Sequence, residues 1–231
     1  MKVIGIIQPG RLGDLIILLP AVKYLSDQGN KIYWPVFSEY VEMFESVIDY
    51  VNFIPIDNNI YTCISSAYSE LNKIRVDKII DIAATFPGSI ATAEYIDRGD
   101  GLKEPFDVFK YDILGVSIEE KWNLNINRNH EAEDVLFNKL VKADKYAVVN
   151  LRHSGGMVNA NIDQSGGQII TVTDDYNIFH WIKILENAST IAMVDSSMFN
   201  LVEQLNIDCK KFLFKKADGR LPSIRNDWVI V

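Results

Sequence analysis

The chain has 231 residues, of which 48% are hydrophobic and 11% aromatic, so it can form sizeable cores and suits two compact domains of about 100 residues each. A net charge of −8 weighs against a protein that binds mainly to a nucleic-acid backbone, because such binding depends on clustered Lys and Arg. Cys63 and Cys209 form no disulfide or metal motif, and no apolar run is long enough to span a membrane. We therefore expect a soluble, cytoplasmic protein without stable membrane insertion.

Hydrophobic periodicity predicts alternating strands and helices through the first half of the chain. The expected strands lie at 2–8, within 29–38, and at 51–57 and 77–84, and the expected helices lie at 14–28, 38–47, 62–75 and 107–116. Pro20 predicts a kink or a late start of the first helix, and Ser38 is expected to cap the second. Residues 85–104 are expected to form a loop with room for a short helix.

The Asn-rich stretch 122–130 is interpreted as a linker, after which the alternation restarts. The expected helices lie at 131–143, 175–188 and 196–206, and the expected strands lie at 145–152, 168–173, 189–195, 210–215 and 227–231. This pattern predicts two α/β domains with mostly parallel sheets, one over 1–125 and one over 130–231. Ligands of such folds bind at the carboxyl ends of the strands and in the crevice between domains.

The loop QPGRLGD at 8–14 interrupts an aliphatic run between the first strand and the first helix. Gly10 and Gly13 permit close approach of a ligand and a positive φ, and the helix that follows offers free N–H groups to an anion. The residues after Gly10 are not the Lys and Ser or Thr of a P-loop. Asp14 suits a general base for a substrate hydroxyl, and Arg11 could pair with an anionic substrate or with Asp14. A plain strand–helix turn capped by Asp14 is the alternative.

A second loop, RHSGGM at 152–157, also follows a buried strand. Arg152 could hold a phosphate as a fork donor, beside His153 and Ser154, with the amides at Gly155 and its neighbour forming an anion-binding nest. The alternative is a solvated glycine turn with an exposed arginine. The repeat of this arrangement in both halves slightly favours a functional loop.

The third loop lies in VDSSMF, where a strand ends at Asp195 and Ser196 and Ser197 begin a helix. A helix N-terminus stabilises an anion, so a diphosphate would fit there; an ordinary helix cap is the alternative. The basic stretch 215–220 favours a solvated turn over a ligand contact. His, Cys, Asp and Glu are not clustered at metal-ligand spacing, so no metal site is expected.

Two segments resemble the heptosyltransferase-like glycosyltransferases of family 9. They are GRLGDLIILLPAVKYL, with its Gly-Asp before an apolar helix, and ILENASTIAMVDSSMFNLVEQLNI, in which a helix and a strand lead to Asp-Ser and a further helix. The resemblance implies the GT-B fold, two Rossmann-like domains facing a cleft. The N-terminal domain would bind the acceptor and the C-terminal domain the nucleotide-sugar.

The resemblance further implies an inverting, metal-independent glycosyltransferase that needs no cofactor besides its nucleotide-diphospho-sugar substrate. Asp14 matches the family's proposed general base, and Ser196 and Ser197, with Asp195 nearby, would hold the donor phosphate. The first donor-domain loop departs from the family, since it reads RHSGG where a lysine or threonine cluster is usual.

Two alternatives on the same fold stay open: a non-catalytic nucleotide or sugar-phosphate binding protein, and a sugar-nucleotide epimerase or hydrolase. The acceptor is left open among a lipid-linked glycan, a free sugar, a protein and a modified DNA base.

Overall fold

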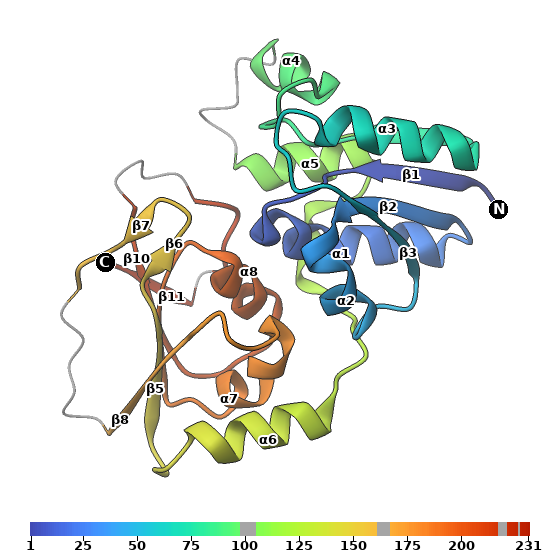
Figure 1. The fold of residues 1–231 in the computed structure, drawn as a ribbon. Helices are drawn as coiled ribbons and strands as arrows, with labels where there is room; N and C mark the ends of the chain where they lie inside the picture. The colour runs from blue at the N-terminus through green and yellow to red at the C-terminus, as the bar shows by residue number, and fades with distance from the viewer. Residues whose placement is uncertain (98–104, 161–166, 217–220, 226) are drawn as a thin grey trace. The chain divides into compact units, whose positions relative to one another are not determined.

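The structure is a computed structural model that describes residues 1–97, 105–160, 167–216, 221–225 and 227–231. The chain divides into two compact units, Met1–Asn127 and Arg128–Val231. Each unit is built on a parallel β-sheet with helices packed against it (Figure 1). The predicted α/β class with parallel sheets is therefore confirmed.

The first unit holds a four-stranded parallel sheet in the order β3-β2-β1-β4. Its strands are β1 (Val3–Ile7), β2 (Lys31–Phe37), β3 (Val51–Ile56) and β4 (Lys78–Asp81). Its helices are α1 (Leu12–Asp27), α2 (Ser38–Glu45), α3 (Cys63–Ile74), α4 (Ile90–Asp97), α5 (Phe106–Leu114) and the 3₁₀ helix η1 (Ile118–Trp122). The chain leaves β1 toward β2 and β3 and returns to β4 on the other side. The end of β1 is thus a topological switch point, where ligands of such sheets bind.

Helix α1 starts earlier than its sequence pattern predicts. It begins at Leu12 and continues through Pro20, so the expected late start is wrong. All eight residues of the run Leu15–Val22 are buried, because this helix is covered on all sides rather than on one face. Asp14 lies in its first turn and is not its cap.

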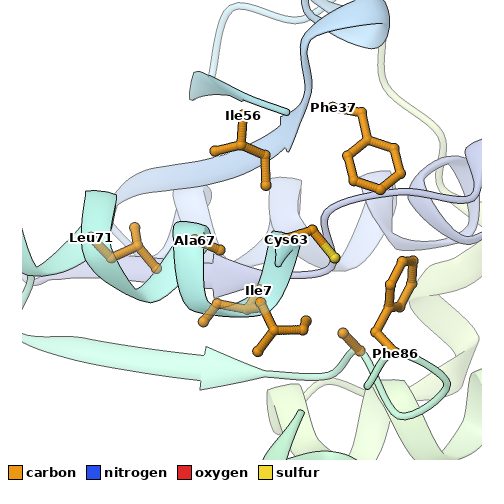
Figure 2. Packing of buried hydrophobic residues seen from close by; sticks show 9 residues of the cluster. Ile7, Phe37, Ile56, Cys63, Ala67, Leu71 and Phe86 are labelled. Atoms are coloured by element: carbon orange, nitrogen blue, oxygen red, sulfur yellow. The ribbon is translucent and has the colours of Figure 1, made fainter. Parts of the chain in front are cut away.

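Helix α3 covers one face of the first sheet over an apolar cluster (Figure 2). The cluster consists of Ile7, Phe37, Ile56, Cys63, Ile64, Ala67, Leu71, Ala83 and Phe86. A Cβ added to Gly5 would lie 2.7 Å from a methyl carbon of Leu71, so the glycine in β1 allows this helix to pack closely. Cys63 is a buried free thiol.

The second unit holds a five-stranded parallel sheet in the order β11-β10-β9-β5-β8 and a short antiparallel hairpin, β6-β7. Its strands are β5 (Tyr146–Asn150), β6 (Arg152–His153), β7 (Gly156–Met157), β8 (Gln168–Thr171), β9 (Thr190–Val194), β10 (Lys210–Phe214) and β11 (Trp228–Ile230). Its helices are α6 (His130–Leu140), η2 (Ile178–Trp181), α7 (Ile182–Glu186) and α8 (Ser197–Gln204). Since β8 and β9 flank β5, the ends of β5 and β9 form the switch point of this sheet.

Several helix ends differ from their predicted places. The helix predicted at 175–188 is a 3₁₀ turn followed by a short α-helix, and the Asn177 side chain caps the turn at Phe179 N. Ser38 does not cap α2, because its hydroxyl donates instead to the carbonyl of Ile56, 2.9 Å away. The loop predicted at 85–104 contains α4, and its last seven residues, 98–104, lie outside the described residues. Within the described part of the chain, no helix combines the length and apolarity needed to cross a bilayer.

Candidate functional site

The loop after β1 is held tightly by the neighbouring strand β2. The Trp34 indole donates to the Gln8 carbonyl at 3.0 Å, and the Phe37 amide donates to the Pro9 carbonyl at 2.8 Å. A Cβ on Gly10 would lie 2.1 Å from the Phe37 ring, so only glycine fits there. The backbone that leads from the sheet to α1 is therefore fixed by packing.

Neither predicted glycine has the positive φ that the sequence suggested. Gly10 makes room for Phe37, and Gly13 lies within the first turn of α1. The left-handed residue of this loop is Arg11, with φ 62°, a conformation that strains a residue with a side chain. The Arg11 carbonyl accepts hydrogen bonds from Asp14 N at 2.8 Å and Leu15 N at 3.2 Å, which opens the helix.

Asp14 is partly buried, with its side chain 13% exposed, and its cationic partner is Lys110 rather than Arg11. Lys110 Nζ and Gln8 Nε2 each lie 3.4 Å from Asp14 Oδ2. Lys110 Nζ also donates to Gln8 Oε1 at 2.7 Å. The exposed Arg11 guanidinium instead lies 5.4 Å from the centre of the Phe86 ring. This arrangement overturns the predicted alternative of an Arg11–Asp14 pair.

Sequence reasoning missed Lys110. Its side chain is 4% exposed, and burial lowers its pKa while the Asp14 carboxylate opposes that shift. The signal that could have identified it is its place on α5, one helical turn after Phe106 and one before Ile113, where a lysine interrupts an apolar stripe.

A shallow depression of about 570 Å³ lies on the first unit between α3 and the loop after β4. Its lining includes Tyr61, Tyr68, Asn72 and Pro87. Asp14 does not line this depression, so the carboxylate and the hollow are separate features of the unit.

In the second unit, the predicted residues Asp195, Ser196 and Ser197 lie together at the end of β9 and the start of α8. Ser196 is the N-cap of α8, and its Oγ accepts from Phe199 N at 3.3 Å. Asp195 forms an ion pair with Lys216 at 2.8 Å. The adjacent parallel strand β10 places Lys216 here, because Phe214 is in register with Val194. The sequence suggested a solvated turn at 215–220; Lys216 is instead half-buried against Asp195, and 217–220 lie outside the described residues.

Arg152 and His153 form β6, and Ser154 and Gly155 form the turn that leads to β7 of the hairpin. Arg152, 60% exposed, pairs with Asp174 at 3.0 Å. The Gly155 amide donates to His153 Nδ1 at 3.1 Å, so this N–H of the predicted nest is already occupied.

Asn150, at the end of β5, connects this hairpin to α8, and sequence reasoning missed it. Its Oδ1 accepts from Arg152 N at 3.3 Å, and its Nδ2 donates to Ser196 Oγ at 3.0 Å. The predicted residues at 152 and 196 are therefore linked through one amide side chain at the switch point of the sheet. The sequence signal that could have identified Asn150 is its position as the last residue of a buried strand.

No protein-family model matches the chain, and no curated protein matches it. Several solved structures, in contrast, match the chain. A family 9 glycosyl transferase from Veillonella parvula DSM 2008 superposes with a TM-score of 0.66 at 11% identity, over 100% of this chain and 85% of that one. The ADP-heptose LPS heptosyltransferase II of E. coli superposes with a TM-score of 0.63 at 10% identity, over 100% of this chain and 90% of that one. The dodecameric iron-containing glycosyltransferase TibC of enterotoxigenic E. coli superposes with a TM-score of 0.60 at 12% identity, over 99% of this chain and 62% of that one. The resemblance read from the two sequence motifs is thus supported at the level of the fold, which this chain shares with these glycosyltransferases.

Proposed function

We propose that this protein is an inverting glycosyltransferase that moves a sugar from a nucleotide-diphospho-sugar to an acceptor hydroxyl. The observation that carries the proposal is Asp14, a partly exposed carboxylate at the switch point of the first sheet, in a fold shared with heptosyltransferases. Asp14 is not the cap of α1, so helix capping does not account for its carboxylate.

In the proposed reaction, Asp14 takes the proton of the acceptor hydroxyl. The acceptor oxygen forms a bond to the anomeric carbon, and the bond from that carbon to the diphosphate oxygen breaks, with its electron pair leaving on the diphosphate. A positioned base of this kind contributes about 10²–10⁴-fold to the rate. Attack from the face opposite the leaving group inverts the anomeric centre.

The start of α8 is the proposed donor-phosphate site of the second unit. The N–H groups of its first turn favour an anion, and Lys216 adds a cation beside Asp195 and Ser196. E. coli heptosyltransferase WaaC, which superposes with a TM-score of 0.53 at 13% identity, has been solved with ADP. We therefore propose an ADP-linked sugar as the first donor to test. Helix N–H groups and Lys216 would stabilise the departing diphosphate without a metal ion, and this metal independence is part of the proposal.

Two measurements test the donor site and the base separately. The first is calorimetric titration with ADP, UDP, GDP and CDP, with and without Mg²⁺; binding of one nucleotide that is independent of Mg²⁺ is expected. The second is Asp14→Asn, which should reduce transfer at least 100-fold and leave nucleotide affinity unchanged, because the amide cannot accept the proton. Loss of both properties, or of neither, would count against Asp14 as the base.

A non-catalytic nucleotide or sugar-phosphate binding protein is the second candidate. It is favoured by the donor loop at 152–155, where the Arg152 side chain and the Gly155 amide are engaged within the second unit. This candidate predicts nucleotide binding without donor turnover. A sugar-nucleotide epimerase or hydrolase would instead form product with no acceptor present.

A further inference from the structure

Lys110 is a buried cation that the proposed reaction does not yet use. Its Nζ lies 2.7 Å from Gln8 Oε1, 3.4 Å from Asp14 Oδ2 and 5.8 Å from the centre of the Phe106 ring. Arg11 and Asp107 also act on it electrostatically. Burying a lysine is costly unless it is paired, so its place beside the candidate base requires an explanation.

Gln8 fixes the geometry between the lysine and the carboxylate. The side chain is fully buried, and its Nε2 donates to the Gly10 carbonyl at 2.9 Å and to Asp14 Oδ2 at 3.4 Å. These donations leave Oε1 as the amide atom that accepts from Lys110. The amide can therefore adopt only one of its two orientations without losing hydrogen bonds.

The side-chain contacts of Asp14 fall on one of its two oxygens. Both Lys110 and Gln8 approach Oδ2, and among the described residues no hydrogen bond or ion pair reaches Oδ1. The carboxylate is also 13% exposed, whereas Lys110 is 4% exposed. The contacted oxygen thus belongs to the interior network, and Oδ1 has no such contact among the described residues.

The helix that carries Lys110 is anchored to the helix that carries Asp14. The Tyr111 hydroxyl donates to the Ile17 carbonyl at 2.9 Å, and Tyr111 is fully buried. Because Tyr111 follows Lys110 directly, this bond sets the distance from α5 to α1 close to the lysine.

We propose that Lys110 and Gln8 are positioning residues for the glycosyl transfer, holding Asp14 through Oδ2 so that Oδ1 receives the proton of the acceptor hydroxyl. This inference rests on the proposed function. Transfer moves the acceptor proton to Oδ1 while the acceptor oxygen bonds to the anomeric carbon and the diphosphate leaves. Lys110 keeps its own proton throughout and acts only through Asp14.

The direct test follows the Asp14 carboxyl carbon by NMR at one fixed pH, with no substrate present and with Asp14→Asn to assign the signal. In Lys110→Met the chemical shift of this carbon should change, because the ammonium 3.4 Å from Oδ2 is lost. In Lys110→Arg, which keeps the charge, the change should be smaller. Lys23→Met removes a lysine that pairs with Asp27 in the same unit, and it should not affect Asp14. An unchanged Asp14 chemical shift in folded Lys110→Met would overturn the proposal.

A second measurement needs no lysine variant, in case Lys110→Met does not fold. The Lys110 Cε resonance should titrate at a lower pH in Asp14→Asn than in the wild type, because the carboxylate that opposes the lowering of the Lys110 pKa is lost. A Lys110 signal that does not respond to Asp14 would contradict the coupling.

Kinetics then connect the coupling to transfer. Lys110→Met should lower kcat about 10- to 100-fold with little change in KM, and Lys110→Arg should recover part of this loss. Unchanged kcat in Lys110→Met would show that the positioning does not serve transfer. If the wild type transfers no sugar but the NMR coupling is present, the proposed function fails while the link between Lys110 and Asp14 stands.

Discussion

Gly10 shows how tightly a single residue of the Asp14 loop is constrained. The Phe37 ring that occupies the space beside it is 6% exposed and packs against the rings of Phe86 and Tyr40. In Figure 2, Phe37 and Phe86 lie at the same end of the apolar cluster. The ring therefore has little freedom to move away from an added methyl group.

We expect Gly10→Ala to lower the free energy of unfolding by about 1–3 kcal/mol, because its Cβ would overlap the Phe37 ring. Urea unfolding measures this loss. Since Gly10 does not have a positive φ, the cost comes from overlap rather than from backbone strain, and Phe37→Leu should make the added methyl group less costly. If the Ala substitution costs as much in the Phe37→Leu background as in the wild type, the overlap is not its cause.

Asp14 and Lys110 differ in how far the sequence alone can identify them. Asp14 follows a short glycine-containing loop at a strand end, and this local pattern was sufficient to select it. Lys110 lies 96 positions later in the chain, and only the packing of α5 on α1 brings it to Asp14. The charge of a helical lysine normally indicates a solvent-facing position, so its burial could not be derived from its neighbours.

At the scale of elements, α8 depends on the cap that also belongs to the candidate donor site. Ser196→Ala should cost about 1 kcal/mol of unfolding free energy, because Phe199 N loses its acceptor and Asn150 Nδ2 loses its partner. Thermal unfolding measures the change. Ser154→Ala alters an exposed serine in the hairpin turn of the same unit and should have an effect within about 0.5 kcal/mol. Equal effects of the two substitutions would show that the cap adds nothing.

Strands were more predictable than helix ends. Short runs such as 2–8 and 189–195 are apolar because both faces of a parallel sheet are covered, and sequence shows this directly. Ser38 illustrates the opposite case: its hydroxyl can cap α2 or bond the end of β3, and the tertiary contact to Ile56 prevails. The hairpin β6-β7 was also missed, since two residues per strand leave no periodic pattern.

At the scale of the whole molecule, each unit has its own parallel sheet and its own buried residues. The first unit also contains an ion pair, Lys121–Asp107, whose side chains are both fully buried and lie 2.7 Å apart. It connects η1 to α5. Removing one partner of such a pair leaves the other charge buried without it, at a cost of about 3–5 kcal/mol.

Lys121→Met should therefore destabilise the first unit selectively. The four tryptophans report on the units separately, because Trp34 and Trp122 lie in the first and Trp181 and Trp228 in the second. With fluorotryptophan incorporated, ¹⁹F NMR follows each residue during urea unfolding. We expect the Trp34 signal to unfold at a lower urea concentration than in the wild type, with Trp181 and Trp228 unchanged.

Lys23→Met is the matched control, since it removes a lysine of the same unit whose partner Asp27 is 58% exposed. Exposed pairs contribute about 0–1 kcal/mol, so Trp34 should unfold almost as in the wild type. The Trp122 signal serves as an internal marker, because the Lys121 ammonium lies 4.9 Å from its ring and its loss changes that environment directly. If Lys121→Met shifts the unfolding of all four signals equally, the units unfold as one cooperative structure, and ligand binding to the second would then also stabilise the Asp14 loop of the first.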